Sequence, residues 1–385
     1  MRIVFFTDTY HPSSDGVVRS IDLFERGLRA DGHQVHICAP GHGASTTARA
    51  SASLRDPGGF RLTLTPSLPF PPYPQYRIPV WTSKSVEASV RFSPDLIHSH
   101  AMVGMGLAAR EAAEKISCPL IGTFHTLVPS AAHYIMPIPA LQGWTGERMW
   151  DYLRWFYSPF DKVLTPSAFM RDKLAEQDIK ADVMPNPVDT DFFKKTKNSK
   201  PSSTASSSRL PRPSVLFLGR VAKEKDLDFL LDMAATREWR AWGAELLIAG
   251  DGPYRKHLEA RAKKEGLASS VRFLGRVPEA RLPALFSFAS CTIQPSTFET
   301  QGLTALESMA CGTPAVVKKD TALAEVVRPG KSGEWMDDDV REAVDIVRGV
   351  CERKAKYASS ARKLALEYSV PKCTARLLGV YRSEL

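Results

Sequence analysis

Two glutamates stand eight residues apart in the segment STFETQGLTALESMACGTPAVV (296–317), the strongest chemical pattern in the chain. If Glu299 begins a helix, Glu307 follows about two turns later, and both carboxylates can address one ligand. The backbone N–H groups at the start of a helix bind anions such as phosphate. Here they would belong to Thr300, Gln301, Gly302 and Leu303. The alternative is an ordinary amphipathic helix with two surface glutamates.

Two cations follow an apolar strand pattern in FLGRVAKEKDLDFLL (217–231). Arg220 ends the apolar run, and Lys225 precedes the next helical pattern. Fixed cations at the carboxyl end of a strand can neutralise the phosphates of a departing nucleotide diphosphate. Solvated loop charges are the alternative interpretation.

A glycine and three histidines lie at further strand ends. Gly16 stands between the first strand and the first helix without the G-x-G-x-x-G spacing, so the dinucleotide fingerprint is absent and a steric role is the alternative. His98, His100 and His125 end two later strands, where packed, hydrogen-bonded histidines are the usual case. We expect no metal site, because no carboxylate or cysteine partners them at ligand spacing. The Asp-x-Asp of 188–193 (Asp189 and Asp191) and the run Asp337–Asp339 are interpreted as turn or surface charge.

These residues need a scaffold of parallel strands. Apolar strand patterns alternate with helical ones, which predicts an α/β fold with parallel sheets covered on both faces. The expected strands of the first half are 2–8, 33–41, 94–100, 119–126 and 161–167, with a helix over 17–32. Those of the second half are 214–220, 244–252, 270–276, 291–296 and 314–320.

A Lys/Ser/Pro-rich stretch, KKTKNSKPSSTASSSRLPRP, separates the two halves. Its composition is typical of a flexible linker. We therefore expect an N-terminal Rossmann-like domain over 1–193, a linker over 194–213 and a second Rossmann-like domain over 214–368. The last segment, 369–385, is expected to be a helix that packs back on the N-terminal domain.

Length and composition set broad limits. The chain has 385 residues and a formal net charge of +9, which favours phosphate-bearing ligands or anionic surfaces. Its six cysteines are scattered, as in a reducing compartment. No apolar run reaches the roughly 18–20 residues of a membrane span, and no signal peptide is expected. We expect a cytoplasmic protein. No stacking motif accompanies the basic residues, so nucleic acid is not an expected partner.

Taken in order, these segments resemble the retaining GT-B-fold glycosyltransferases of the family that includes phosphatidylinositol mannosyltransferases and diacylglycerol glucosyltransferases. The resemblance runs from TDTYHP through HSH, GTFHT, TPS and MPNPVDTDFF to FLGR, AGDGP, VRFLGRV and the E-x7-E segment. It implies two Rossmann-like doubly wound domains facing each other across a cleft, with the first domain binding the acceptor and the second the nucleotide sugar.

The resemblance also implies roles for individual residues. Arg220 and Lys225 match the pair that binds the donor diphosphate as leaving group, and Glu299 matches the carboxylate that contacts the transferred sugar. Glu307 matches the one that holds the ribose, and His125 matches the histidine of the reaction centre. The remaining donor contacts are Gly16, Thr300, Gln301, Gly302 and Leu303. Asp15 and Gln301 depart from the commoner family pattern, and ETQG and HTLVPSAAHYIMP (125–137) are similar to the glycolipid-forming branch.

We therefore expect a retaining, metal-independent hexosyltransferase without cofactor, using a donor of the UDP-glucose or GDP-mannose type and a lipid acceptor such as diacylglycerol or a glycolipid. The aromatic segments 66–81 and 144–160 favour peripheral contact with an anionic membrane, although core packing of these rings is the alternative. A same-fold enzyme making a soluble saccharide or polysaccharide is the alternative function. A nucleotide-sugar 2-epimerase is a further alternative, which ETQG disfavours.

Overall fold

The computed structural model describes residues 1–13, 15–41, 60–70, 73–125, 139–196 and 212–385. These residues form two compact units, one of Met1–Pro187 with Val370–Leu385 and one of Val188–Ser369. The expected linker falls mostly on 197–211, which lie outside the described residues. Val188 pairs with Ser369, and Arg362 donates to the carbonyls of Thr190 and Phe193, so 188–193 belong to the second unit rather than to the first.

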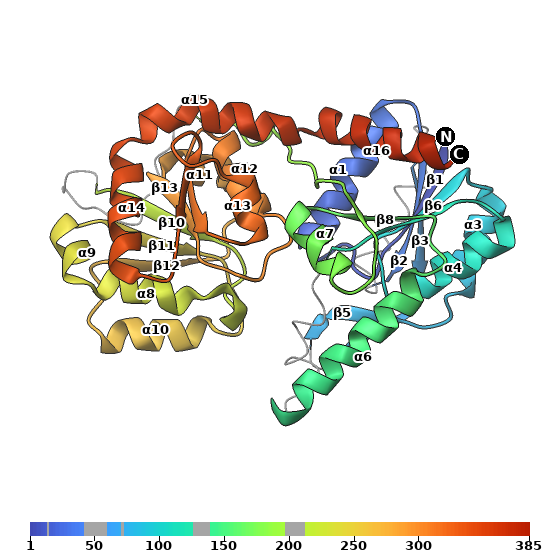
Figure 1. Ribbon diagram of the computed structural model, residues 1–385, viewed down its shortest axis with the longest axis horizontal. Coiled ribbons are helices and arrows are strands. Elements are labelled where there is room, and N and C mark those ends of the chain that lie inside the picture. Colours follow the sequence, from blue (N-terminus) through green and yellow to red (C-terminus); the bar gives the residue numbers. More distant parts are fainter. Residues whose placement is uncertain (14, 42–59, 71–72, 126–138, 197–211) are drawn as a thin grey trace. The chain divides into compact units, whose positions relative to one another are not determined.

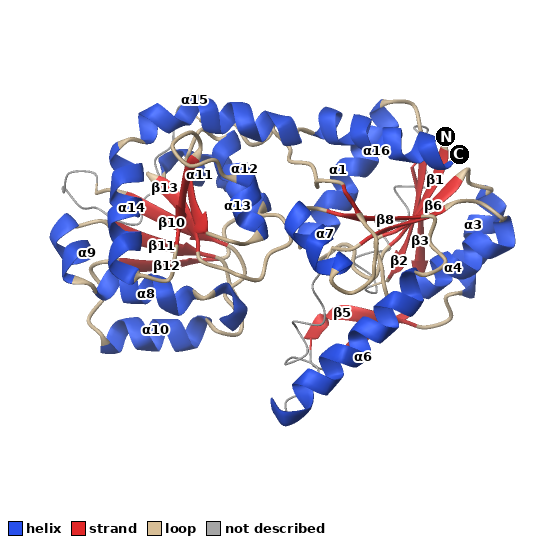
Figure 2. Cartoon of the chain, viewed as in Figure 1, coloured by secondary structure: helices blue, strands red, loops and turns tan. Residues whose placement is uncertain are grey.

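The first unit is a seven-stranded parallel sheet in the order β3-β2-β1-β6-β7-β8-β9, with a small antiparallel hairpin of β4 and β5 (Figures 1 and 2). Its strands are β1 (Arg2–Phe6), β2 (Gln34–Pro40), β3 (Phe60–Thr65), β4 (Ser67–Phe70), β5 (Tyr73–Pro79), β6 (Leu96–Ser99), β7 (Leu120–Thr123), β8 (Lys162–Thr165) and β9 (Asp182–Val183). Its helices are α1 (Gly16–Ala30), α3 (Ser83–Phe92), α4 (Gly104–Ile116), α6 (Pro139–Tyr157), α7 (Ala168–Ala175) and α16 (Val370–Glu384).

The second unit is a six-stranded parallel sheet in the order β12-β11-β10-β13-β14-β15. Its strands are β10 (Ser214–Leu218), β11 (Glu245–Ala249), β12 (Val271–Gly275), β13 (Cys291–Gln294), β14 (Ala315–Lys318) and β15 (Gly333–Met336). Its helices are α8 (Leu227–Ala235), α9 (Arg237–Trp242), α10 (Arg255–Lys264), α11 (Leu282–Phe288), α12 (Leu303–Ala310), α13 (Ala322–Val326), α14 (Val340–Glu352) and α15 (Lys354–Ala365). Short 3-10 helices are η2 (Lys223–Lys225), η3 (Glu279–Arg281) and η4 (Leu366–Tyr368).

Both faces of the second sheet are covered because its buried strands are apolar throughout. Along β10, Val215 and Phe217 pack into one core with helices α8 and α14, while Leu216 packs into the opposite core with α12. The alternation follows from the two-residue period of a strand. It confirms the expected parallel α/β architecture with helices on both faces (Figure 2).

The C-terminal helix lies beside the first helix of the chain (Figure 1). The side chain of Tyr381 is fully buried, and its hydroxyl shares a 2.6 Å hydrogen bond with Nδ1 of His98 at the end of β6. Gly27 allows this close packing, since a Cβ there would lie 2.0 Å from Oγ1 of Thr374. In the part of the chain that is described, no helix combines the length and apolar character needed to span a bilayer.

Candidate functional site

The strand order gives each sheet a switch point, the place where sheets of this kind bind ligands. In the second unit β10 and β13 are neighbours. The strands that follow β10 in the sequence lie on one side of this pair, and those that follow β13 lie on the other side. In open α/β sheets ligands bind at the carboxyl ends of the strands at this switch point. Arg220 lies two residues beyond β10, and Glu299 lies five residues beyond β13. The expected donor-site residues therefore stand where the fold itself favours a ligand.

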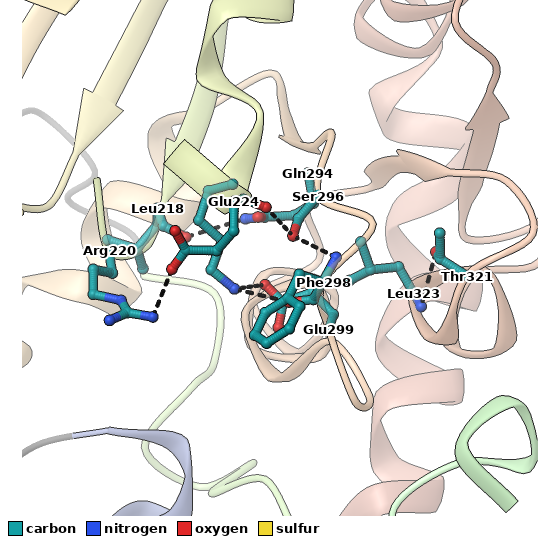
Figure 3. Close-up of polar contacts among 10 residues, drawn as sticks. Leu218, Arg220, Glu224, Gln294, Ser296, Phe298, Glu299, Thr321 and Leu323 are labelled. Atoms are coloured by element: carbon teal, nitrogen blue, oxygen red, sulfur yellow. Dashed lines mark hydrogen bonds and ion pairs between the residues drawn. The ribbon is translucent and has the colours of Figure 1, made fainter. Parts of the chain in front are cut away.

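Lys225 and Glu299 form an ion pair between these two strand ends. Lys225 closes η2, and its Nζ donates to Oε1 of Glu299 at 2.6 Å and to the carbonyl of Phe298 at 3.1 Å. The side chains are 13% and 27% exposed, so both groups can still be reached from solvent. Figure 3 shows Glu299 and Phe298 together at this point. The structure thus brings together two residues that are 74 positions apart in the sequence.

A second ion pair anchors Arg220. Its Nη2 donates to Oε1 of Glu224 at 2.7 Å, and the Glu224 side chain is only 6% exposed (Figure 3). Sequence reasoning missed Glu224, although its place one residue before Lys225 was a usable signal. Since Arg220 is 35% exposed, one face of the guanidinium is held while the group keeps access to solvent.

Two further polar side chains join the end of β13 and its following loop to the end of β10 and its following loop. Nε2 of Gln294 donates to the carbonyl of Leu218 at 3.1 Å, and Oγ of Ser296 donates to the carbonyl of Glu224 at 3.3 Å (Figure 3). These contacts fix the separation of the two charged loops. Neither residue was expected from the sequence, because nothing in the local pattern shows which distant carbonyl it meets.

The expected helix start at Glu299 is wrong. Helix α12 begins at Leu303, so Glu299, Thr300 and Gln301 precede it in a loop. Gly302 is its N-cap with φ of +104°, a backbone conformation that only glycine adopts readily, and a Cβ there would lie 2.7 Å from Cδ2 of Leu323. The loop therefore ends in a turn that cannot continue the helix backwards. Glu299 is placed by Lys225 rather than by helix geometry.

Glu307 lies inside α12 and is 2% exposed. Gln301, just before the helix, is also 2% exposed. Buried polar side chains need hydrogen-bond partners, so polar contacts as well as apolar packing hold this segment in place. Among the expected donor-side backbone groups, only that of Leu303 belongs to the first turn of the helix.

In the first unit Asp15, which departs from the commoner family pattern before Gly16, has a structural role as a helix cap. Its carboxylate accepts from the backbone N–H groups of Val17 and Val18, both at 3.0 Å, and so caps α1. Oγ1 of Thr9 donates to the same carboxylate at 2.8 Å. Gly16 is the first residue of α1 and follows this cap directly. The loop thus retains an ordered N-terminus of a helix at the end of β1.

The three histidines form one buried cluster. His100 and His125 share a hydrogen bond of 2.8 Å between Nδ1 and Nε2, and His98 stacks on His100 with ring centroids 4.2 Å apart. Nε2 of His98 also shares a 2.7 Å hydrogen bond with Oγ1 of Thr123. Burial lowers the pKa of His98 and of His125 to about 3, and it lowers that of His100 as well. At neutral pH the cluster is therefore uncharged.

The Asp189/Asp191 pair and the run Asp337–Asp339 are turn and surface charges, as expected, and Asp338 pairs with Lys318. Oδ1 of Asp189 accepts from the N–H groups of Asp191 and Phe192, and Oδ1 of Asp339 caps α14. Asp337 lies beside Lys319 at 3.9 Å. Within the residues that the structure describes, no group of three or more histidine, cysteine, aspartate or glutamate side chains has the arrangement of a metal site.

Each unit is a doubly wound sheet with polar groups at its switch point, an arrangement that suits a phosphate-bearing ligand but is shared by many enzymes. Family models agree along the chain: Glycosyltransferase Family 4 matches residues 14–192, and Glycosyl transferases group 1 matches residues 199–364. A relative from Streptococcus pneumoniae named alpha-monoglucosyldiacylglycerol synthase is 30% identical over 85% of this chain and 73% of its own length. The chain belongs to the glycosyltransferase family that these two models and this relative represent.

Other similarities extend over the full length. A GDP-mannose-dependent alpha-mannosyltransferase of Mycolicibacterium smegmatis is 26% identical and covers 100% of this chain and 98% of its own. The crystal structure of Anabaena Alr3699/HepE in complex with UDP and glucose has a TM-score of 0.77, with 18% identity and complete coverage of both chains. This structural likeness confirms the GT-B fold class that the sequence resemblance implied.

Proposed function

We propose that this glycosyltransferase moves a hexose from a nucleotide sugar to a lipid acceptor, with retention of anomeric configuration and without metal. The observation that carries the proposal is the meeting of Lys225 and Glu299 at the ends of β10 and β13. A cation for phosphate and a carboxylate for sugar hydroxyls then stand 2.6 Å apart, beside Arg220 and its own buried carboxylate partner.

The donor chemistry follows from these charges. Lys225 and Arg220 would hold the diphosphate and stabilise the negative charge that develops as the sugar leaves, and Glu299 would accept hydrogen bonds from the sugar. A leaving phosphate oxygen on the face where the acceptor approaches would take the proton of the acceptor hydroxyl. These two side chains would supply the positive charge that a divalent ion gives in other transferases, which is the basis for proposing a metal-independent reaction.

The lipid acceptor is supported by the names of relatives and by the surface of the first unit. The name of the Streptococcus relative describes a diacylglycerol product. Large apolar side chains are exposed on this unit: Leu68 (60%) and Ile78 (46%), which face each other across β4 and β5, and Trp81 (78%) just beyond. Such side chains suit insertion among lipid headgroups. We propose diacylglycerol or a glycolipid as acceptor class.

The second aromatic segment divides between core and surface. Phe156 and Tyr157 of α6 are buried in the first unit, as the core-packing alternative requires, whereas Trp155 is 52% exposed. The Arg110 guanidinium lies 4.3 Å from the Trp155 ring centroid. An exposed indole beside an arginine fits the interface of an anionic membrane. Peripheral membrane association is therefore proposed on Trp81 and Trp155, not on the whole segment.

One experiment tests both the donor and the acceptor proposals. The purified chain would be incubated with UDP-glucose or GDP-mannose and with diacylglycerol vesicles, glycolipid vesicles or soluble sugars, while free nucleotide diphosphate is measured. We expect release that depends on a lipid acceptor and persists in EDTA. Release with soluble sugars alone would favour the soluble-saccharide alternative, and a loss in EDTA that magnesium reverses would contradict the metal-independent reaction.

The membrane contact has its own test. Vesicle flotation of the Trp81→Ala and Trp155→Ala variants should show weaker binding to anionic vesicles than the parent chain, while Trp335→Ala in the second unit serves as an exposed control (37% exposed). Equal flotation of all four proteins would remove these two indoles from the proposed contact.

A further inference from the structure

Two cysteines from distant parts of the chain meet in the second unit. Cys291 is the first residue of β13, and Cys351 lies in the last turn of α14. Their Sγ atoms are 3.4 Å apart across 60 residues of sequence. A disulfide has a sulfur separation of about 2.05 Å, so small side-chain adjustments would bring the pair to bonding distance.

The neighbouring Lys354 holds the two elements in this arrangement. Its Nζ donates to the carbonyl of Ser287 at 2.9 Å and to that of Ala289 at 2.5 Å, just before Cys291. The junction of α14 and α15 is thus tied to the start of β13 without any covalent bond.

The two sulfurs differ in access. Cys291 is completely buried, whereas Cys351 is partly exposed. The hydrogen bond from Cys351, together with burial, raises the pKa of the Cys291 thiol well above its usual range. An external reagent therefore reacts with Cys351 first, and Cys291 is the buried sulfur that can react with Cys351 afterwards.

We propose that Cys291 and Cys351 form a reversible oxidation site that a hydroperoxide converts into a disulfide. The Cys351 thiolate attacks one peroxide oxygen, so that an S–O bond forms, the O–O bond breaks and the other oxygen leaves as hydroxide or alkoxide. Sγ of Cys291 then attacks Sγ of Cys351, the S–S bond forms, the S–O bond breaks, and water leaves with the proton of Cys291. A dithiol reverses the change by reducing the disulfide to two thiols.

The disulfide would lock the α14–α15 junction onto the central strand β13. It lies at the amino end of that strand, whereas Gln294 and the charged loops follow the carboxyl end. Closing a long loop restricts the unfolded chain and stabilises the folded unit. The expected effect is greater resistance of the second unit to unfolding, with the donor site unchanged.

The test uses the reduced full-length chain treated with hydrogen peroxide, blocked with N-ethylmaleimide and digested with trypsin without reduction. We expect a cross-linked pair of peptides, 282–318 and 349–353, lighter by two hydrogens than their sum. Because 282–318 also contains Cys311, the Cys311→Ser variant is the matched control and should keep the cross-link. Cys291→Ser and Cys351→Ser should each abolish it.

Stability gives a second readout. Oxidation should raise the unfolding midpoint of the second unit by about 5–10 °C, dithiothreitol should reverse the rise, and Cys351→Ser should show none. Recovery of both cysteines as separate alkylated peptides after oxidation would overturn the proposal. So would a cross-link that survives in Cys291→Ser or is lost in Cys311→Ser. None of these outcomes depends on which sugar or acceptor the enzyme uses.

Discussion

The two units place different kinds of polar groups at the ends of their sheets. In the second unit these are charged side chains joined in ion pairs and partly exposed, Lys225 with Glu299 and Arg220 with Glu224. In the first unit the histidines that follow β6 and β7 are buried, hydrogen-bonded and uncharged at neutral pH, and the carboxylates of Asp8 and Asp15 after β1 accept from backbone N–H groups. Similar strand topologies therefore support cation–carboxylate pairs in one unit and a neutral histidine cluster in the other.

The difference indicates what each unit can bind. Partly exposed cations favour a diphosphate, whose charge they can neutralise, and in this structure each of them pairs with a carboxylate. A neutral buried histidine can exchange hydrogen bonds with hydroxyl groups but adds no charge that would attract a phosphate. We interpret the second unit as the donor-phosphate side and the histidine cluster as a partner for uncharged groups.

The largest effect is expected from removing a phosphate-binding cation. Lys225→Ala should slow transfer by about 2–4 kcal/mol, the range for a lost preorganised charge, with Arg220→Ala in the same range. Initial rates at saturating acceptor would measure it. The matched control is Lys223→Ala, since Lys223 lies exposed in the same 3-10 helix. Near-normal turnover of Lys225→Ala would remove this lysine from the reaction.

The two cations should differ in their effect on folding. Arg220→Ala takes the ion-pair partner from Glu224, which is nearly buried, so it should lower stability as well as activity. Glu299, the partner of Lys225, is already 27% exposed in the parent chain, so water can solvate it when the lysine is removed. The thermal unfolding of Lys225→Ala should therefore stay close to that of the parent chain. Melting curves recorded together with the initial rates would show whether a variant loses activity because a charge is missing or because the protein is less stable.

The two glutamates should fail in different ways. Glu299→Gln should lower turnover strongly while leaving nucleotide diphosphate binding nearly unchanged, because its role is to position the transferred sugar. Glu307→Gln should instead weaken binding of free UDP or GDP by about 1.5–3 kcal/mol, the value of a charge-assisted hydrogen bond. Titration calorimetry beside initial rates compares the two variants. If Glu299→Gln lost nucleotide affinity and Glu307→Gln kept it, the placement of this segment against the donor would be wrong.

A smaller effect concerns acid stability. Since burial lowers the folded-state pKa of His98 and His125 to about 3, these side chains take up protons mainly when unfolded as pH falls below their ordinary value of about 6.5. Stability is therefore complete above that value and declines below it. From about pH 7.5 to about pH 5.5, the first unit should lose about 1.4 kcal/mol for each of these two histidines.

Hydrogen exchange resolved by peptide would measure this loss in each unit separately. The second unit contains one histidine, His257, which is exposed, so it serves as an internal control. Equal losses of protection in both units over this range would contradict the assignment of the acid sensitivity to the buried histidines of the first unit, which are His36 and the three of the cluster.

The sequence predicted the architecture well because buried parallel strands are continuously apolar. Both sheets follow from patterns such as RIVFF and SVLFL, and the helices between them have a clear apolar face. It did not predict β15 or the two edge strands β3 and β9, which lack that signal. Strand β9 is two residues long, and both of them are exposed.

The site was predicted in its residues more than in its geometry. The spacing of Glu299 and Glu307 suggested a shared helix, but a left-handed Gly302 places the helix start later, and no local pattern shows that an available glycine adopts this conformation. Gln294 and Ser296 act through contacts with backbone carbonyls 76 and 72 residues away in the sequence. Such contacts depend on the packed sheet and therefore could not be derived from local spacing.

The comparison of the two units is tested most directly by nucleotide binding to three full-length proteins. Calorimetric titration with UDP and GDP would compare the parent chain, Lys225→Ala and His125→Gln. We predict that Lys225→Ala weakens binding of the preferred nucleotide by about 1.5–3 kcal/mol, whereas His125→Gln binds it as the parent does and loses only turnover. Loss of nucleotide affinity in His125→Gln with full affinity in Lys225→Ala would contradict the assignment of the charged loops of the second unit to the donor diphosphate.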